Sequence, residues 1–160
     1  MLVSKRQFLK FSGVAAVAFT FGCSKNASAG NGFTFTKTDA EWRKALSPGA
    51  YDVLRREKTE TRYSSRLNTE KRIGTYSCVG CGQALFLSKT KFESNTGWPS
   101  FYQPLAKSVA TSTDYNIGVP RTEVHCARCG GHLGHVFDDG PKPTGKRYCM
   151  NGVAMNFSPA

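Results

Sequence analysis

The chain shows three patterns of apolar and polar residues. A continuous apolar run at 11–22 follows a positively charged start. Residues 38–54 carry apolar residues at helical spacing, whereas from residue 74 onward short apolar runs alternate with Gly, Pro and Asn. The last pattern is typical of antiparallel strands. We therefore predict one mainly β domain that is preceded by two short helices.

The first of these helices has a clear start. Thr38-Asp39-Ala40-Glu41 has the form of a capping box, in which a Thr hydroxyl and a Glu carboxylate each bind a free backbone N–H group. Trp42 and Leu46 follow as an apolar stripe on one face. The pattern predicts an amphipathic helix that begins after Thr38.

The second helix follows directly. Ser47-Pro48-Gly49 ends the first helix and begins the next, because Pro suits the first position of a helix. Tyr51 and Leu54 are then expected to face the core. The stretch from Arg55 to Arg72 is dense in charge, so we expect a solvated loop there.

The first 29 residues have the order of an export signal. The apolar run 11–22 is too short to span a bilayer, and Ala27-Ser28-Ala29 follows as an A-x-A cleavage site. An N-terminal core helix would explain neither the charge at the start nor the small residues at the end. We expect removal of residues 1–29, which leaves residues 30–160 as one domain in the periplasm.

Two details bear on the route of export. Residues 4–10 resemble a twin-arginine signal with Lys5 in place of the first arginine, and that route carries folded proteins. Thr20-Phe21-Gly22-Cys23 resembles a poor lipobox, and cleavage there would leave Cys23 lipidated and the protein tethered to a membrane. We favour the soluble periplasmic form.

Charge says little about the chemistry. The formal net charge is +11, but the signal segment holds four basic residues and no acidic ones, so the remaining chain carries +7. A basic surface favours anionic partners without identifying them. The charge is therefore weak evidence for a nucleic-acid partner.

Four of the six cysteines form two matching pairs. Cys78-Val-Gly-Cys81 and Cys126-Ala-Arg-Cys129 are both followed by Gly and, three residues later, Leu. Together they supply four thiolates, the ligand set of a closed tetrahedral Zn²⁺ site. Because 44 residues separate the pairs, such a site would join distant strands. A closed shell leaves no position for a reacting water, so the predicted zinc is structural.

Two other readings of these pairs stay open. The periplasm is oxidising, so each pair could form a disulfide, and one pair could be a redox C-x-x-C motif. The duplication disfavours the redox motif, and folding around zinc before export disfavours the disulfides. His125 beside Cys126 is a substitute ligand in principle, but with four cysteines present we expect a bystander.

Cys149 has no partner cysteine after residue 29. In Lys146-Arg-Tyr-Cys-Met-Asn-Gly152, strand alternation places Arg147, Cys149 and Asn151 on one face, with Tyr148 and Met150 on the other. A free cysteine is more often buried filler than a nucleophile. Here, however, a guanidinium favours the reactive thiolate and an amide lies on the same side, so we predict a nucleophile.

Two further clusters carry chemistry. His132 and His135 are three residues apart, so both can face one site only if Gly134 bends or bulges the strand; otherwise one or both are structural. Trp98, held by Pro99, forms a rigid aromatic wall in a loop. Phe101 after it is expected in the core.

These motifs together resemble the B-type methionine sulfoxide reductases. The matching segments are Gly97-Trp-Pro-Ser-Phe101, the two cysteine pairs, His132-Leu-Gly-His-Val-Phe-Asp-Asp-Gly-Pro141 and Arg147-Tyr-Cys-Met-Asn151, and the similarity runs from about Thr38 to Phe157. The resemblance implies a fold of two antiparallel sheets with short N-terminal helices, and a structural zinc site away from the catalytic cleft.

The resemblance also implies roles for single residues. It assigns the nucleophile to Cys149 and the structural zinc ligands to Cys78, Cys81, Cys126 and Cys129. The remaining matches form or support the substrate pocket, as catalytic groups (His132, His135, Asn151) or as substrate-binding groups (Trp98, Arg147, Phe137).

The implied reaction reduces the R epimer of methionine sulfoxide, free or in oxidised proteins. The Cys149 thiolate attacks the sulfoxide sulfur while His135 or His132 protonates the oxygen, and Cys149 is left as a sulfenic acid. The Trp98 ring would pack against the methyl group of the substrate. By resemblance, a thioredoxin-like protein supplies the reducing thiols.

The chain departs from the family at one position. Many members have a second, resolving cysteine in the loop before Gly97-Trp98-Pro99, where this chain has Thr96. The only other spare thiol is Cys23, which cleavage at Ala29 removes. We therefore expect an external thiol to attack the sulfenic acid directly.

Two non-catalytic functions compete with this reading. A zinc ribbon that binds nucleic acid would suit the cysteine pairs and the charge, but it leaves the export signal and the Cys149 motif unexplained. A redox sensor, oxidised once at Cys149, is a closer rival. Repeated turnover separates the enzyme from both.

Overall fold

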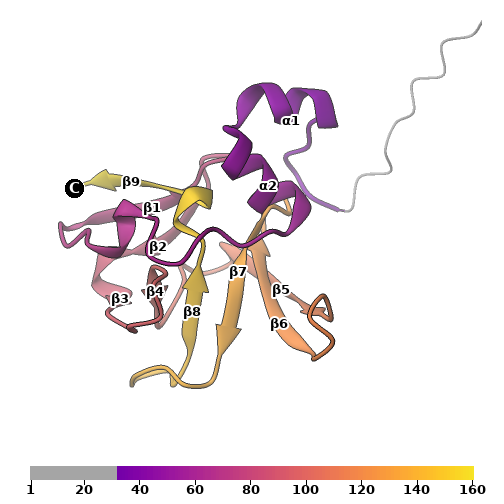
Figure 1. Cartoon of the computed structure of the whole chain (residues 1–160). Helices are drawn as coiled ribbons and strands as arrows, with labels where there is room; N and C mark the ends of the chain where they lie inside the picture. Colours follow the sequence, from indigo (N-terminus) through magenta and orange to yellow (C-terminus); the bar gives the residue numbers. More distant parts are fainter. Residues whose placement is uncertain (1–31) are drawn as a thin grey trace, which may run out of the picture.

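The computed structural model describes residues 32–160. The predicted signal, its cleavage site and Cys23 lie outside the described residues. Two antiparallel sheets and two short helices make up the domain (Figure 1), so the predicted fold class is confirmed. Within residues 32–160, no helix has the length and apolar character needed to cross a membrane.

The two helices begin where the capping signals place them. Helix α1 (Asp39–Ala45) starts with a complete capping box, in which the Glu41 N–H donates to Thr38 Oγ1 at 3.3 Å and the Thr38 N–H donates to the Glu41 carboxylate at 2.8 Å. Helix α2 (Pro48–Arg56) has Pro48 at its first turn and Ser47 as its cap. The expected apolar residues of both helices are buried: Trp42, Leu46, Tyr51 and Leu54.

The smaller sheet holds the C-terminal strand. Its order is β2-β1-β9, from Ala84–Leu87, Gly74–Cys78 and Met155–Pro159. Strand β1 lies in the middle and pairs along its whole length with β9, so the end of the chain packs against the start of the β body (Figure 1).

The larger sheet has six strands in the order β3-β4-β8-β7-β6-β5. Their bounds in chain order are Lys91–Phe92, Ser100–Phe101, Val109–Asp114, Arg121–Cys126, His132–Phe137 and Arg147–Met150 for β3 to β8. Strands β5 to β8 are consecutive neighbours, and β4 pairs with the outer side of β8. This order places β8 between β4 and β7.

An aromatic core joins the two sheets. Phe86 of β2 stacks on Phe101 of β4 at 4.3 Å between ring centroids, and Tyr76 of β1 meets Phe101 edge-on at 4.9 Å. All three side chains are fully buried, as is Met150 of β8. These rings cover the inner face of β4 and β8. Polar side chains lie on the opposite face of the large sheet.

The charged stretch after α2 differs from the expectation in one respect. It is a loop apart from a short 3-10 turn, η1 (Arg66–Asn68), as predicted. It is not solvated throughout, however, because Glu60 turns inward and binds the backbone of η3 (Gly152–Ala154). Hydrogen bonds from backbone N–H groups to an ionised carboxylate are stronger than bonds between neutral groups. Glu60 therefore attaches the loop to η3 at this point.

Candidate functional site

Cys149 lies on the polar face of the large sheet, directly opposite His135 on the neighbouring strand. His135 is in turn opposite Glu123 on β6. Cys149 is partly exposed, whereas His135 is buried. We call the residues Cys149, His135, His132 and Arg147 the reaction face, since the same side of the sheet carries all four.

A β-bulge brings the two histidines together. Val124 pairs with Gly134 but the next residue, His125, pairs with His132, so Leu133 is the extra residue on β7. The rings of His132 and His135 are consequently 5.3 Å apart. The sequence required such a bulge for both histidines to reach one site, and the structure contains it.

Close backbone approach explains the glycine in this bulge. A Cβ atom on Gly134 would lie 2.1 Å from the Cys149 carbonyl oxygen and 3.0 Å from the Met150 Cα. Both neighbours are backbone atoms, so neither can move aside cheaply. Only glycine allows β7 to lie this close to the strand that carries Cys149.

A carboxylate holds each histidine. His132 Nδ1 is 2.8 Å from a Glu123 oxygen, and His135 Nε2 is 2.6 Å from an Asp114 oxygen. The second ring nitrogen of His132 is buried and has no hydrogen-bond partner among the described residues. Each ring therefore has one nitrogen held by a carboxylate.

The electrostatics of this group follow from its contacts. The backbone N–H of Asn116 and then the His135 ring lower the pKa of Asp114 to about 2, and Arg121, at 2.6 Å, adds to the effect. Contacts with His125 and then His132 hold the pKa of Glu123 well below its usual range. Burial lowers the pKa of His135, against the opposing effect of Asp114. At neutral pH both carboxylates are therefore ionised.

Arg147 is fixed beside Cys149. Its guanidinium binds Asp139 with two hydrogen bonds of 2.8 Å and lies over the Phe137 ring, 4.4 Å from the centroid. The pKa of Arg147 is raised mainly by the bonds to Asp139 and further by the nearby Cys149. A permanent cation thus adjoins the sulfur, as the alternation of residues on β8 predicted.

Asn151 uses both ends of its side-chain amide within the protein. Its Oδ1 accepts from the Glu60 N–H at 2.9 Å, and its Nδ2 donates to the Leu133 carbonyl at 3.0 Å. Asn151 follows β8 and caps η3, so it joins the loop, the bulge and the end of the nucleophile strand. Its geometry is that of a residue that positions the bulge.

Glu60 is a residue of the site's support that the sequence analysis missed. Its carboxylate accepts from the N–H groups of Gly152 at 2.6 Å and Val153 at 2.8 Å, and its carbonyl accepts from the Trp98 indole at 3.2 Å. It therefore fastens both the aromatic wall and the turn after the nucleophile. A single acidic residue in a charged loop carries no local signal that separates it from its solvated neighbours.

Trp98 and Phe101 take different places, as expected. Trp98 is half-buried and has the Arg62 guanidinium 5.9 Å from its ring centroid, whereas Phe101 is fully buried in the core.

Glu123 and Asp114 are the other residues that the sequence analysis missed. If the pairing of β5 and β6 with β7 had been known, strand alternation would have placed both carboxylates on the same face as the histidines.

Thr96 lies against Cys149. Its Oγ1 is 3.8 Å from Cys149 Sγ. The loop position that the sequence analysis singled out for its missing cysteine therefore lies next to the Cys149 sulfur, and it carries a hydroxyl.

The four paired cysteines form one cluster. Their sulfurs all lie within 4.8 Å of one another; Cys78 and Cys129 are 3.8 Å apart, and Cys81 and Cys126 are 3.5 Å apart. These separations fit a tetrahedral ion, because metal–sulfur bonds of about 2.3 Å put the sulfurs roughly 3.8 Å apart. They exceed the ~2.05 Å of a disulfide bond. The cluster could hold a metal such as zinc.

Helix α2 and the N-terminal lead-in pack next to this cluster. Arg55 donates to the Cys129 carbonyl at 3.3 Å, and the Phe35 N–H donates to the Arg128 carbonyl at 3.0 Å. Cys78 ends β1 and Cys126 ends β6, so an ion there would join the two sheets beneath the helices.

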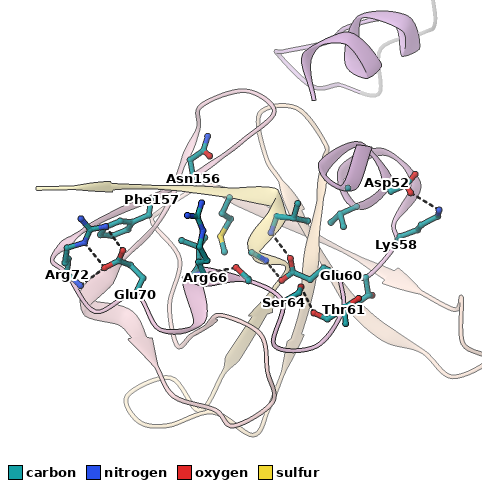
Figure 2. Close-up of a pocket in the computed structure, with 18 residues that line it drawn as sticks. Asp52, Lys58, Glu60, Thr61, Ser64, Arg66, Glu70, Arg72, Asn156 and Phe157 are labelled. Atoms are coloured by element: carbon teal, nitrogen blue, oxygen red, sulfur yellow. Dashed lines mark hydrogen bonds and ion pairs between the residues drawn. The ribbon is translucent and has the colours of Figure 1, made fainter. Parts of the chain in front are cut away.

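A hollow of about 890 Å³ lies beside Glu60 (Figure 2). It is lined by the loop after α2, by η3 and by β9, with Arg66 and Arg72 among the labelled side chains. None of the reaction-face residues lines it.

Comparison with known proteins agrees with the geometry. A family model described as the SelR domain matches residues 46–159. The peptide methionine sulfoxide reductase MsrB of Methanosarcina barkeri is 53% identical over 122 residues, covering 76% of this chain and 86% of that protein. The protein of the same name in Leptospira interrogans is 48% identical over 126 residues, covering 78% and 96%. That of Pseudomonas putida is 52% identical over 124 residues, covering 77% and 93%. The chain belongs to the B-type methionine sulfoxide reductases.

Proposed function

We propose that this chain reduces the R epimer of methionine sulfoxide to methionine, with Cys149 as its nucleophile. The observation that carries the proposal is the partly exposed Cys149, next to Arg147 and opposite a carboxylate-held histidine. Methionine sulfoxide reduction and protein repair are the activity of the family. The choice of epimer and the covalent chemistry are the proposed part.

The proposed step leaves the oxygen on the enzyme. The Cys149 thiolate attacks the sulfoxide sulfur and forms a sulfur–sulfur bond while a proton reaches the sulfoxide oxygen. The hydroxyl then moves to Cys149 Sγ as the sulfur–sulfur bond breaks, which releases methionine and leaves Cys149 as a sulfenic acid. The two electrons that reduce the sulfoxide thus come from the oxidation of the Cys149 thiolate to the sulfenic acid. His132 and His135 are the proposed proton donors, since each has one ring nitrogen that no carboxylate occupies.

Binding of the substrate uses the side chains around the sulfur. Trp98 walls the methyl group, while Arg147 and Phe137 line the approach to Cys149. Asn151 acts with them by holding the bulge, since its amide is bonded to Leu133 and Glu60. A site at the surface of the sheet admits methionine sulfoxide in a protein as well as the free amino acid.

Regeneration is proposed to need an external thiol. Among residues 32–160, the cysteines other than Cys149 are the four of the metal cluster, and Thr96 stands next to the nucleophile. One external thiol condenses with the sulfenic acid and releases water, and a second thiol reduces the mixed disulfide. A thioredoxin-like protein is the proposed reductant.

The proposed metal is one structural Zn²⁺ per chain. Four thiolates close its coordination shell, so it would fix the ends of β1 and β6 and take no part in the reaction.

We further propose that residues 1–29 direct the chain to the periplasm, with a lipid anchor at Cys23 as the alternative. Mass spectrometry of the protein from a periplasmic extract distinguishes a chain that begins at Gly30 from one that begins at a lipidated Cys23.

Turnover on resolved epimers tests the function. The purified chain that starts at Gly30 should convert a dabsylated methionine-R-sulfoxide repeatedly with dithiothreitol and leave the S epimer unchanged. The variant Cys149→Ser should lose turnover and keep its zinc. A stop after one equivalent would favour the redox sensor, and no conversion together with salt-dependent nucleic-acid binding would favour the zinc ribbon.

Regeneration has a separate test. After one equivalent of substrate without reductant, mass spectrometry should find Cys149 as a sulfenic acid, trapped with dimedone. An intramolecular disulfide at Cys149 would contradict direct attack by an external thiol.

A further inference from the structure

A chain of hydroxyl groups ends at the nucleophile. Ser100 on β4 lies directly opposite Cys149 and is 1% exposed. Its Oγ is 2.7 Å from Ser94 Oγ, which is 2.8 Å from Thr96 Oγ1, and this last oxygen is 3.8 Å from Cys149 Sγ. The three hydroxyls therefore connect a buried strand position with the reacting sulfur through hydrogen-bond distances.

The protons in this chain can be counted. Each hydroxyl has one proton to donate and can accept at its oxygen. When Ser100 donates to Ser94 and Ser94 donates to Thr96, the remaining proton of Thr96 is directed at Cys149 Sγ. Ser100 Oγ also lies 3.1 Å from the Trp98 carbonyl, so the opposite orientation is available when the sulfur needs no donor.

Contacts on its outer side hold the loop with Ser94 and Thr96. Arg62 Nε donates to the Thr96 carbonyl at 2.6 Å, and Tyr63 donates to the Asn95 carbonyl at 3.1 Å. Asn95 adopts a left-handed backbone conformation, with φ of 58°. The Thr96 hydroxyl is consequently placed at the sulfur by the backbone.

We propose that Thr96 is a catalytic residue that donates a hydrogen bond to the Cys149 thiolate, with Ser94 and Ser100 as positioning residues that set the direction of its proton. The role rests on the proposed function of Cys149 as nucleophile. A donor to a charged acceptor stabilises it more than a donor to a neutral one, so the bond favours the thiolate over the thiol.

Other charged groups also face this sulfur and stay the same in the test. Arg147, paired with Asp139, lies on the same strand, and His135, paired with Asp114, lies opposite on β7. Replacing Thr96 changes none of these. A change in thiolate formation in that variant is therefore assigned to the hydroxyl.

The test is the rate of alkylation of Cys149 in zinc-loaded protein without substrate. Iodoacetamide is used at pH 7 and at pH 10, and peptide mass mapping identifies the alkylated cysteine. We expect Thr96→Val to slow alkylation about tenfold at pH 7 and less than about twofold at pH 10, which lies above the ordinary pKa of a thiol. Thr96→Ser keeps the hydroxyl and should stay within about twofold of the unchanged chain at both values.

A second variant reaches the same hydroxyl without altering Thr96. Ser94→Ala removes the donor to Thr96 and should slow alkylation at pH 7 by about two- to fivefold, since Thr96 is then free to turn away. An unchanged rate at pH 7 in Thr96→Val, or an equal loss at both pH values, would overturn the proposal. Equal loss would mean that the substitution only blocks access to the sulfur.

The same preparations separate this inference from the proposed function. A single turnover without reductant measures methionine formed per chain. If the unchanged chain forms none, the function of Cys149 as nucleophile fails, while the alkylation rates still decide whether Thr96 donates to the sulfur. If methionine forms, Thr96→Val should form it about tenfold more slowly at pH 7, and Thr96→Ser should match the unchanged chain.

Discussion

Cys149 on β8 faces His135 on β7 as a directly opposed pair of the large sheet, and the bulge that brings His132 alongside begins two residues before His135. The nucleophile and both imidazoles therefore belong to one rigid sheet. The reaction face depends on strand pairing as much as on the side chains themselves.

Gly134 should not tolerate a side chain. Gly134→Ala places a Cβ 2.1 Å from the Cys149 carbonyl oxygen, so β7 and β8 must separate at the nucleophile. We expect a loss of about 2–4 kcal/mol in unfolding free energy and at least a hundredfold loss of kcat/KM, measured by urea unfolding and by turnover. Gly49→Ala in helix α2 is the control, because its added Cβ meets only Val153 at 3.6 Å. Equal stability of the two variants would contradict the close approach.

Glu60 should act on the site from the loop. Glu60→Ala leaves the N–H groups of Gly152 and Val153 without their acceptor, so we expect about 1–3 kcal/mol less stability and a lower kcat. The exposed Glu57→Gln serves as the matched control, with changes below about 0.5 kcal/mol expected. Urea unfolding and steady-state kinetics measure both effects. A Glu60→Ala chain that behaves like Glu57→Gln would mean that the loop is solvated after all.

Asp114 should stabilise the fold at neutral pH and not in acid. Its folded pKa of about 2 lies below the unfolded value, so its contribution is complete above the unfolded pKa and is lost as the pH falls through the folded one. We therefore expect Asp114→Asn to be less stable than the unchanged chain at pH 7, with the difference shrinking between about pH 4 and pH 2. Unfolding by urea at pH 7, 4 and 2 measures this difference. A gap that stays constant over that range would be inconsistent with an ionised Asp114.

Removal of the metal should destabilise the domain without changing Cys149. With the ion absent, four sulfurs within 4.8 Å of one another lose the charge that holds them together. We expect a chelator to lower the Tm by more than about 10 °C and to slow turnover only as the chain unfolds. Calorimetry with and without chelator, and elemental analysis for zinc, check the result. The same Tm in both samples would show that the cluster has no structural ion.

Local sequence signals predicted the elements that depend on near neighbours. The capping box at Thr38, the Pro48 helix start and the burial of Tyr51 and Leu54 are all properties of one helical turn, and all are confirmed. Repetition of the cysteine pairs predicted the cluster, because the same local turn occurs twice. The need for a bend or bulge at Gly134 could also be predicted, because side chains in a regular strand alternate strictly between the two faces.

The carboxylates behind the histidines could not be assigned in this way. Asp114 and His135 are 21 residues apart in sequence, and they meet only because β5, β6 and β7 lie side by side in that order. Glu60 binds Asn151 across 91 residues, through a loop whose charge suggested solvent. The spacing of residues along a chain does not reveal which loop folds back onto which strand.

The sequence alone determined the helix starts, the alternating strand residues and the identity of the chemical groups, because these depend on backbone preferences and side-chain types within a few residues. Tertiary structure decided which of those groups meet. Strand order placed Cys149 between Ser100 and His135, and the loop before β4 set the Thr96 hydroxyl at its sulfur. The physical reason is that such contacts follow from burying the shared aromatic core, which fixes strands from distant parts of the chain against one another.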